Sequence, residues 1–379
     1  MTMIDDEILN SILRRFGILE AEATKLDIGI VHQSFHIRAL KGNAKNIAQN
    51  APGPINGMPH RPPTQAEYIL QKINHFSVET NDNIVKITEV LKQNGHETFD
   101  LMRALETDTA YIIDDNNVIW RLLSKIQGFT LNCCPNPTLS ESAARLLADF
   151  HNLFAKQTIT LAPLPFQFHN FSLYYRELEL ALTKRNHRFH ANVIKLKSAI
   201  DQALSPLKPM IETLPTLRKR IVHQDLKFNN VMLRQENPAA SEAKAVALID
   251  FDTVNYNPLY IDLGDAWRHW CNPHGEDGPR VEFDLAIFEA SAQAYFSTLD
   301  IPLQQDEKQS IHLAPEIIAL ELCIRFSTDI INEHYFGWHR TKFQSAAEHN
   351  LLRAENQLAL VHELMRTRSK RLKYLNRLF

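Results

Sequence analysis

Hydrophobic and polar positions alternate in the first third of the chain in a way that predicts a small β-sheet. Four segments have this strand-like pattern: residues 27–39, which contain a turn, and residues 68–74, 109–113 and 118–123. The last two flank residues 114–117, Asp-Asp-Asn-Asn, a composition typical of a tight hairpin turn. A mainly antiparallel sheet is therefore expected.

Helical spacing interrupts this sheet pattern twice. Residues 8–16 predict an opening helix, and a second helix is predicted to begin at Asn81 or Asp82 and to end at Gly95. Residues 40–64 are rich in Gly, Asn and Pro, which predicts a long mobile connection that packs no core.

The remainder of the chain has mostly helical periodicity. The helical segments are residues 138–156, with Thr138 or Ser140 as the cap, and residues 171–185, 193–204 and 316–334. Gly128 and two prolines interrupt the pattern near residues 126–137, where we place a boundary. The prediction is an α+β fold of two lobes, a small antiparallel β-lobe over residues 1–127 and a larger helical lobe over residues 128–379.

Two short apolar strands in the second lobe carry polar residues at a distinctive spacing. The first strand leads into a His223-x-Asp225-x-x-x-x-Asn230 loop, and the second ends at Asp250. A proton-accepting carboxylate followed by two oxygen ligands for a metal ion is what phosphoryl transfer to a hydroxyl group requires. The pattern therefore indicates a small-molecule kinase that uses ATP and Mg²⁺.

Each residue of this pattern has a candidate role. Asp225 is the candidate base, and Asn230 with Asp250 supplies the hard oxygen atoms that Mg²⁺ prefers. Lys227 lies where its ammonium group can reach the transferring phosphate. His223 belongs to the same catalytic set, and we interpret it as a residue that braces the loop by hydrogen bonding rather than as a reactant.

The first lobe holds the candidate nucleotide-binding residues. Backbone amides of the hairpin can cradle phosphates where side chains are small or turned away. Its candidates are Gly29, His32, Gln33 and Ser34. Lys72 is the candidate partner of the inner phosphates, with a solvent-facing lysine as the alternative, and Glu89 is interpreted as a surface residue rather than as the partner of Lys72.

Three further carboxylates follow the metal-binding strand. Asp262 or Asp265 is expected to cap the helix that starts there, and one of them to reach back to the catalytic loop. Asp252 is expected to hold the turn after Asp250, with a second metal ion as the alternative. We assign all three a structural role.

The helix predicted over residues 316–334 is apolar around most of its circumference, yet Glu321, Arg325 and Asp329 recur at every fourth position. On a largely buried helix, such charges either satisfy one another or border a cleft. A kinase needs a cleft for its acceptor, so Arg325 is the candidate substrate-binding residue.

Composition and charge narrow the possible partners. The 379 residues are 44% hydrophobic and 22% charged, with a net charge of -3, so nucleic acid is not expected. No uncharged apolar run approaches the ~18 residues of a membrane span, and the start of the chain lacks a secretory signal. Four cysteines without a disulfide framework fit reduced thiols in a cytoplasm. We expect a monomer or homodimer that acts on a small molecule, without a membrane partner. The basic tail, residues 366–377, is interpreted as a solvated helix end.

The motifs resemble those of a known family. The loop from His223 to Asn230, residues 249–253 and residues 262–268 resemble the aminoglycoside phosphotransferase and protein-kinase-like superfamily. Within it, the hairpin, the segment around Lys72, the segment that begins at Arg325 and residues 350–357 are similar to N-acetylhexosamine 1-kinases. The resemblance covers nearly the whole chain.

The resemblance implies a bilobal protein-kinase-like fold and a hexose or N-acetylhexosamine acceptor, phosphorylated at the anomeric hydroxyl. It also implies that Asp225 acts as base, that Asn230 and Asp250 bind metal, and that Arg325 contacts the sugar. A kinase of aminoglycosides, choline or homoserine is the alternative within enzymes, and a nucleotide-binding pseudokinase is the alternative outside them. Retention of the base, Lys227 and both metal ligands favours an active enzyme.

Overall fold

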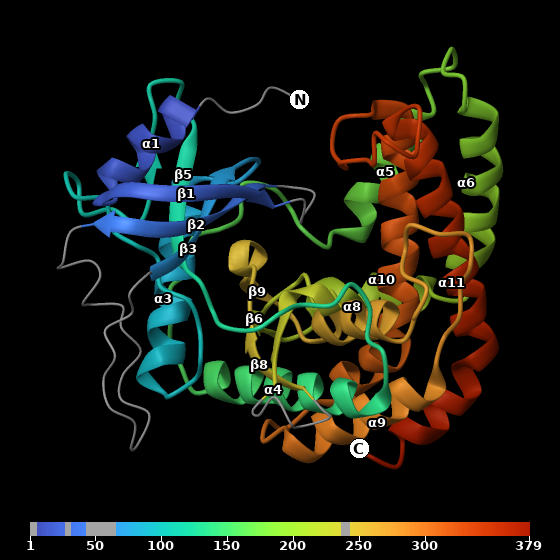
Figure 1. Cartoon of the computed structure of the whole chain (residues 1–379). Coiled ribbons are helices and arrows are strands. Elements are labelled where there is room, and N and C mark those ends of the chain that lie inside the picture. Colours follow the sequence, from blue (N-terminus) through green and yellow to red (C-terminus); the bar gives the residue numbers. More distant parts are fainter. Residues whose placement is uncertain (1–5, 27–31, 43–65, 236–242) are drawn as a thin grey trace. The chain divides into compact units, whose positions relative to one another are not determined.

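The computed structural model describes residues 6–26, 32–42, 66–235 and 243–379 (Figure 1). The chain divides into two compact units, Met1–Gln127 and Gly128–Phe379. Strands dominate the first unit and helices the second, which confirms the expected α+β class.

The first unit is built on a five-stranded antiparallel sheet with the strand order β1-β2-β3-β5-β4. The strands are β1 (Ile18–Leu26), β2 (Gln33–Gly42), β3 (Ala66–Ile73), β4 (Ile112–Ile113) and β5 (Ile119–Ser124). The sequence pattern missed β1, because six of its nine residues are exposed and few apolar side chains mark a buried face. Residues 27–31 and 43–65, which include most of the predicted connection, lie outside the described residues.

Helix α1 (Asp6–Arg15) contributes to the core of this unit. Its apolar side chains and Phe16 join buried residues of the sheet, among them Ile37, Leu70 and Leu122. Trp120 is also buried there, and its indole Nε1 donates a hydrogen bond to Asp114 Oδ2 over 2.9 Å. The other oxygen of this carboxylate accepts two backbone N–H groups of the β4–β5 turn, which explains the tight hairpin.

Helix α3 (Val78–Gln93) begins earlier than predicted. Ser77 occupies the N-cap position, whereas Asn81 lies inside the helix and is fully buried, so the expected cap at Asn81 or Asp82 is wrong. Glu89 is exposed, as expected of a surface residue.

The second unit consists of helices and two small two-stranded sheets. Its helices are α4 (Pro137–Ala155), α5 (Phe171–Ala181), α6 (His190–Leu204), α7 (Lys208–Thr213), α8 (Tyr260–Trp270), α9 (Leu285–Thr298), α10 (Gln305–Asn332) and α11 (Ala346–Leu375). Strands β6 (Lys219–Val222) and β9 (Asn255–Pro258) pair with each other, as do β7 (Val231–Arg234) and β8 (Lys244–Leu248). The cap of α4 is Asn136 and not Thr138 or Ser140, because the Asn136 side chain accepts the Leu139 N–H.

Helix α10 is the central helix of this unit and runs beside α11 (Figure 1). It begins at Gln305, eleven residues before the predicted start, because Gln304 and Glu307 form a capping box at its N-terminus. Pro315 lies inside the helix and does not end it. Helix α8 packs closely against it at Gly264, where a Cβ atom would lie 2.7 Å from the Ala314 carbonyl oxygen.

The basic tail is not a simple solvated helix end. Arg371 is fully buried and forms an ion pair with Glu316 of α10. Arg368 Nε lies 3.0 Å from the same carboxylate. The expected solvated helix end is wrong, because the last turns of α11 pack in the protein interior, where Arg371 and Leu375 are buried.

The four cysteines are free, in agreement with the sequence. Within the described part of the chain, no helix is long and apolar enough to cross a membrane.

Candidate functional site

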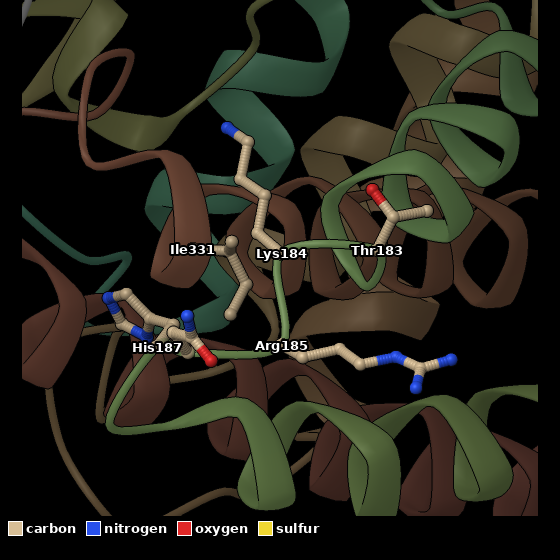
Figure 2. Close-up of a pocket in the computed structure, with 6 residues that line it drawn as sticks. Thr183, Lys184, Arg185, His187 and Ile331 are labelled. Carbon is tan, nitrogen blue, oxygen red and sulfur yellow. The ribbon is translucent and has the colours of Figure 1, made fainter.

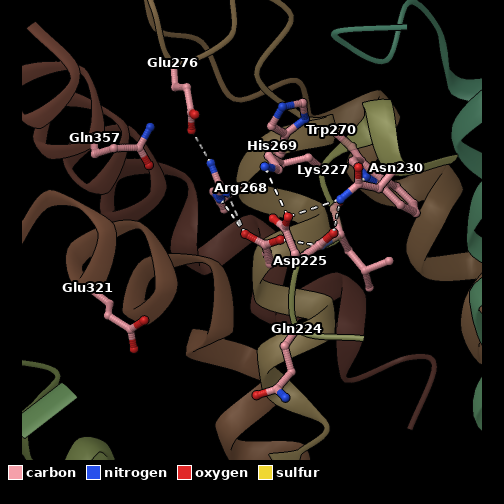
Figure 3. A network of polar contacts seen from close by, with 12 residues as sticks. Gln224, Asp225, Lys227, Asn230, Arg268, His269, Trp270, Glu276, Glu321 and Gln357 are labelled. Atoms are coloured by element: carbon pink, nitrogen blue, oxygen red, sulfur yellow. Dashed lines mark hydrogen bonds and ion pairs between the residues drawn. The ribbon is translucent and has the colours of Figure 1, made fainter. Parts of the chain in front are cut away.

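The candidate catalytic residues share one short loop between β6 and β7. Asp225 Oδ2 lies 3.2 Å from Lys227 Nζ and 3.2 Å from Asn230 Nδ2 (Figure 3). Asn230 Nδ2 also donates a hydrogen bond to the Asp225 carbonyl oxygen over 2.8 Å. These contacts use the amide nitrogen of Asn230, so its side-chain oxygen remains available as a ligand.

Lys227 keeps the candidate base ionised. Desolvation alone raises the pKa of Asp225, but the positive charge of Lys227 and its contact with the carboxylate outweigh this effect, so this pKa lies below its ordinary value. Desolvation acts to lower the pKa of Lys227, yet Asp225 and other carboxylates raise it overall. The side chains are about a quarter exposed, 25% for Asp225 and 28% for Lys227, so substrates can reach them.

Helix α8 holds the loop through the carboxylates singled out in the sequence. Asp262 accepts the backbone N–H groups of His223 and Gln224 over 2.8 and 2.7 Å, and Asp265 accepts that of Leu226 over 2.5 Å. Both residues therefore reach back to the loop. Neither caps the helix, whose N-cap position is occupied by Leu259.

Two more residues of α8 continue this support. Trp270 Nε1 donates to the Leu226 carbonyl oxygen, and His269 Nδ1 accepts the Phe228 N–H. Burial and the charge of Arg268 lower the pKa of His269 to about 3, so its ring stays neutral and can accept. Helix α8 thus contacts several peptide groups of the loop between residues 223 and 228.

His223 lies where bracing requires it. Its Nε2 is 2.9 Å from the Ile249 carbonyl oxygen, and its Nδ1 accepts the Asp225 N–H over 3.3 Å. The ring is fully buried. His223 therefore links the catalytic loop to the residue that precedes Asp250.

Asp250 and Asn230 fit a magnesium site in their chemistry. Asp250 is exposed to solvent, yet desolvation and the carboxylates of Asp252 and Asp225 raise its pKa. A bound cation would neutralise these neighbouring negative charges and favour the ionised form of Asp250. Among the described residues, no three His, Cys, Asp or Glu side chains cluster as metal ligands. Mg²⁺ needs only one or two protein carboxylates when substrate phosphates and water complete its shell. Asp252 is buried within the turn that follows.

Arg325 lies within a group of aromatic rings. Its guanidinium carbon is 5.0 Å from the ring centres of Phe168 and Tyr174, 5.2 Å from Tyr335 and 5.4 Å from Phe336. Arg325 makes no hydrogen bond or ion pair with any residue that the structure describes. The rings hold the guanidinium by cation–π attraction and leave its N–H donors without acceptors.

Glu321 and Asp329 do not form a charge ladder with Arg325. Glu321 Oε1 lies 2.9 Å from His169 Nδ1, and Asp329 accepts the backbone N–H groups of His334, Tyr335 and Phe336. The second oxygen of Glu321 is buried and has no hydrogen-bond partner, which costs stability. The alternative in which these three charges satisfy one another is therefore wrong.

The candidate nucleotide-binding residues lie in the first unit. Gln33 of β2 lies opposite Lys72 of β3 in the strand register. Lys72 makes no ion pair with Glu89 or with another described residue. Ser34 accepts a hydrogen bond from Gln71 over 3.3 Å, and His32 accepts the Asn74 N–H over 3.2 Å. The sheet therefore brings the ends of β2 and β3 together. Gly29 lies outside the described residues.

Residues 61–298 match the model of a family described as the phosphotransferase enzyme family. This match spans more than half of the chain. The chain belongs to the phosphotransferase enzyme family.

Solved structures share the fold of this phosphotransferase. An aminopropanol kinase associated with a microcompartment has 12% identity, covers 96% of this chain and 98% of its own, and has a TM-score of 0.59. Choline kinase from Cryptosporidium parvum Iowa II has 14% identity, coverages of 99% and 100%, and a TM-score of 0.52. Spectinomycin phosphotransferase in complex with ADP and spectinomycin has 11% identity, coverages of 96% and 98%, and a TM-score of 0.54. These similarities confirm the protein-kinase-like fold class.

The candidate site contains residues that the sequence did not single out. The contacts of Trp270 and His269 with the loop could have been suspected, since these residues follow Asp262 and Asp265 at helical spacing. Glu276 lies 2.7 Å from Arg268 (Figure 3). Neither Glu276 nor His169 has such a signal in the sequence, because each lies in an irregular segment and meets its partner only in the folded chain.

A separate hollow of about 550 Å³ lies on the second unit (Figure 2). It is lined by Thr183, Lys184, Arg185, Asn186, His187 and Ile331. Lys184 binds Asn332, and His187 lies 3.3 Å from Glu333. None of the candidate catalytic or acceptor residues line this hollow, so we assign it no part in phosphoryl transfer.

Proposed function

We propose that this phosphotransferase is a small-molecule kinase that transfers the γ-phosphate of ATP to a hydroxyl group, with Asp225 as the base. The depressed pKa of Asp225 makes it a carboxylate at neutral pH. In the proposed reaction this carboxylate takes the hydroxyl proton while the hydroxyl oxygen bonds to the γ-phosphorus. The bond between that phosphorus and the bridging oxygen breaks, and ADP leaves.

Asn230 and Asp250 are the proposed ligands of Mg²⁺. The ion supplies charge neutralisation for the phosphate oxygens when it is bound. Lys227, which pairs with Asp225, is oriented by this ion pair. Lys72 and the hairpin residues His32, Gln33 and Ser34, with Gly29, are proposed to bind ATP.

The proposed acceptor is a hexose or N-acetylhexosamine, phosphorylated at the anomeric hydroxyl. The observation that carries this proposal is the guanidinium of Arg325. Aromatic rings hold it, and no described residue forms a hydrogen bond or an ion pair with it. A neutral sugar is recognised through many directed hydrogen bonds, and a guanidinium offers five donors in one plane. Asp225 is among the charges that raise the pKa of Arg325, so the two residues lie within electrostatic range.

A kinase of amino alcohols or aminoglycosides is the second candidate. Aromatic rings that surround a cation are the usual site for ammonium ligands, and structures named aminopropanol kinase and choline kinase share the fold. In this chain, however, the cation within the rings is its own Arg325. Of the nearby carboxylates, Asp329 is engaged by backbone amides and Glu321 is engaged by His169 through one oxygen, which leaves a single buried carboxylate oxygen for a cationic acceptor.

The remaining features support an active enzyme with a small-molecule partner. A nucleotide-binding pseudokinase has no need for Asp225, Lys227 and both metal ligands together. We propose a cytoplasmic monomer or homodimer without a nucleic-acid or membrane partner.

ATP consumption across a panel of hexoses, N-acetylhexosamines, aminoglycosides and amino alcohols tests the proposal. We expect phosphorylation of a sugar, and expect alkaline hydrolysis or NMR of the product to place the phosphate on the anomeric oxygen. Turnover of amino alcohols or aminoglycosides without turnover of sugars would replace the acceptor assignment with the second candidate.

A further inference from the structure

His169 connects two parts of the second unit that carry different proposed roles. Its side chain is 4% exposed and lies just before α5. Nδ1 lies 2.9 Å from Glu321 Oε1 on α10, and Nε2 lies 3.0 Å from the carbonyl oxygen of Gln224. Gln224 immediately precedes Asp225, so one imidazole joins the helix of Arg325 to the peptide that carries the proposed base.

The two contacts together require a proton on each nitrogen of the His169 ring. A carbonyl oxygen and an ionised carboxylate are hydrogen-bond acceptors only, and a neutral imidazole has a single N–H group. His169 can make both hydrogen bonds to these partners only as the doubly protonated imidazolium. Burial alone lowers the pKa of His169, but Glu321 and the Gln224 carbonyl outweigh it, so this pKa is raised.

We propose that His169, kept cationic by Glu321, is a positioning residue that fixes the peptide between Gln224 and Asp225 and thereby orients the base. This inference rests on the proposed function only in taking Asp225 as that base. Its basis is the pair of hydrogen bonds and the conformation of Gln224, whose φ of 71° lies in the left-handed region. A residue without glycine's freedom stays in that region only where its surroundings hold it.

The Gln224 peptide is held on every side that can bond. Its N–H is donated to Asp262, its side chain donates to the Thr253 carbonyl oxygen, and its own carbonyl oxygen accepts from His169. The N–H of the following peptide, that of Asp225, is donated to His223. Removing the His169 side chain would therefore leave the Gln224 carbonyl oxygen without its charged hydrogen-bond donor.

The charges around His169 come from several elements. Glu321 faces it from α10, and Asp265 on α8 also raises its pKa. Arg325 of α10 lies over the ring of Phe168, whose centre is 4.3 Å from that of His169, and thus opposes the cation. The direct contact with Glu321 outweighs the desolvation, so His169 should lose its proton at a higher pH than an ordinary histidine.

Steady-state kinetics of full-length variants test the positioning role. His169→Phe keeps a ring without N–H groups, and His169→Gln keeps one donor. We expect kcat to fall roughly ten- to a hundredfold in His169→Phe, the usual effect of losing a hydrogen bond to a charged group, and to recover partly in His169→Gln, with the KM for ATP nearly unchanged. A folded His169→Phe enzyme with the wild-type kcat would overturn the proposal.

Glu321→Gln tests the same role while keeping the imidazole. Glutamine can accept from Nδ1 but removes the negative charge, so we expect the alkaline decline of kcat to move to lower pH. Glu307→Gln is the matched control, because Glu307 is a buried carboxylate of the same helix that pairs with Arg220. It should lower the melting temperature and leave the pH profile in place. An unchanged pH profile in Glu321→Gln contradicts the proposal.

NMR of the ¹⁵N-labelled histidine rings gives a readout that needs no turnover. The His169 signals are assigned by their loss in His169→Gln, and we expect both ring nitrogens to carry protons at pH 7.5 in the wild type but not in Glu321→Gln. A neutral His169 ring at pH 7.5 would refute the inference. This outcome is independent of the acceptor and of Asp225. An active Asp225→Asn enzyme would refute the base assignment, and with it the orienting role of His169, but it would leave the measured charge of the His169 ring unchanged.

Discussion

Asp225 is the residue on which the proposed chemistry depends most. Replacing its carboxylate with an amide in Asp225→Asn removes the proton acceptor while preserving size. Loss of a catalytic acid-base group usually costs roughly 10² to 10⁴ in rate, so we expect turnover to be nearly abolished and ATP binding to persist. Asp250→Ala should instead weaken metal-dependent nucleotide binding. Turnover assays with calorimetric titration of ATP separate these effects, and more than about half of the activity in Asp225→Asn contradicts the base assignment.

Arg325 is the residue that distinguishes the proposed acceptor. A hydrogen bond to a charged group contributes ~1.5 to 3 kcal/mol, so Arg325→Ala should lower kcat/KM for the sugar roughly ten- to a hundredfold. The affinity for ATP should change little. Arg325→Lys is the matched control: it keeps the charge but loses the planar fork, and we expect it to recover only part of the loss.

The measurement for Arg325 combines sugar kinetics, ATP affinity and thermal stability in each variant. Because Arg325 makes no ion pair with Glu321 or Asp329, its loss should leave no unpaired partner on the helix. A stably folded Arg325→Ala enzyme with wild-type sugar kinetics would exclude the proposed contact.

The sequence predicted the candidate site residues themselves more readily than the residues that hold them in place. Asp225, Asn230 and Asp250 lie on one loop and one strand end, where short-range spacing reveals them. His169 meets Glu321 across 152 sequence positions, so only the folded chain brings them together. The sequence also suggested that Arg325 aligns with Glu321, which helical spacing allows, but spacing does not reveal that each carboxylate has another partner.

At the scale of elements, α8 serves the catalytic loop as a rigid support. Asp262 accepts two backbone N–H groups of the loop and lies 2.9 Å from His151. We expect Asp262→Asn to lower both the free energy of unfolding and kcat, because an amide offers one acceptor oxygen where the carboxylate offers two. Chemical denaturation monitored by circular dichroism, together with turnover assays, checks this.

The effect of Asp262→Asn should depend on pH. Burial acts to raise the pKa of Asp262, but hydrogen bonds and the charge of His151 lower it overall. A depressed folded pKa means that the carboxylate stabilises the fold above its unfolded pKa of about 3.9 and loses this contribution as pH falls through the folded value. The difference in unfolding free energy between wild type and variant should therefore narrow below about pH 3.9. A difference that stays constant down to pH 2 would contradict it.

The crossing of α8 and α10 depends on Gly264. A methyl group there would lie 2.6 Å from the Ile318 side chain and 2.7 Å from the Ala314 carbonyl oxygen. Overpacking of a dense interior typically costs about 1 to 3 kcal/mol, so Gly264→Ala should lower the melting temperature clearly. Gly278→Ala is the matched control, since its nearest new contact would be at 4.0 Å. Equal melting temperatures for the two variants would contradict this role.

Element boundaries show where sequence patterns were insufficient. The helix predicted over residues 316–334 begins at Gln305, because the cap at Gln304 establishes it before Pro315, which lies within α10. Asn81 is a good cap by residue type, but it is buried in α3 and Ser77 occupies the cap position. A local capping box sets the start of α10, and Asn81 is buried inside α3 rather than at its cap, whereas the turn at Asp114 follows from local hydrogen bonds and was predicted.

At the scale of the whole molecule, Glu316 anchors the end of the chain to the interior of the second unit. It is fully buried and engaged by Arg368 and Arg371 of α11. Removing one partner of a buried ion pair typically costs about 3 to 5 kcal/mol, so Glu316→Gln should lower the free energy of unfolding by a similar amount. Glu363→Gln breaks the pair with Arg366, which is 68% exposed, and should change the free energy of unfolding far less, because solvent screens an exposed pair. Urea denaturation of both variants provides the comparison.

The tryptophan that donates its indole N–H to Asp114 has a practical use. Trp120 is the only tryptophan of residues 1–127, and the other three, Trp267, Trp270 and Trp338, follow Gly128. Its indole is buried and hydrogen-bonded within the first unit. A chain that keeps Trp120 and has phenylalanine at the other three positions would emit fluorescence from the first unit alone. Its emission, recorded during denaturation, would report whether the β-sheet unit melts independently of the helical one.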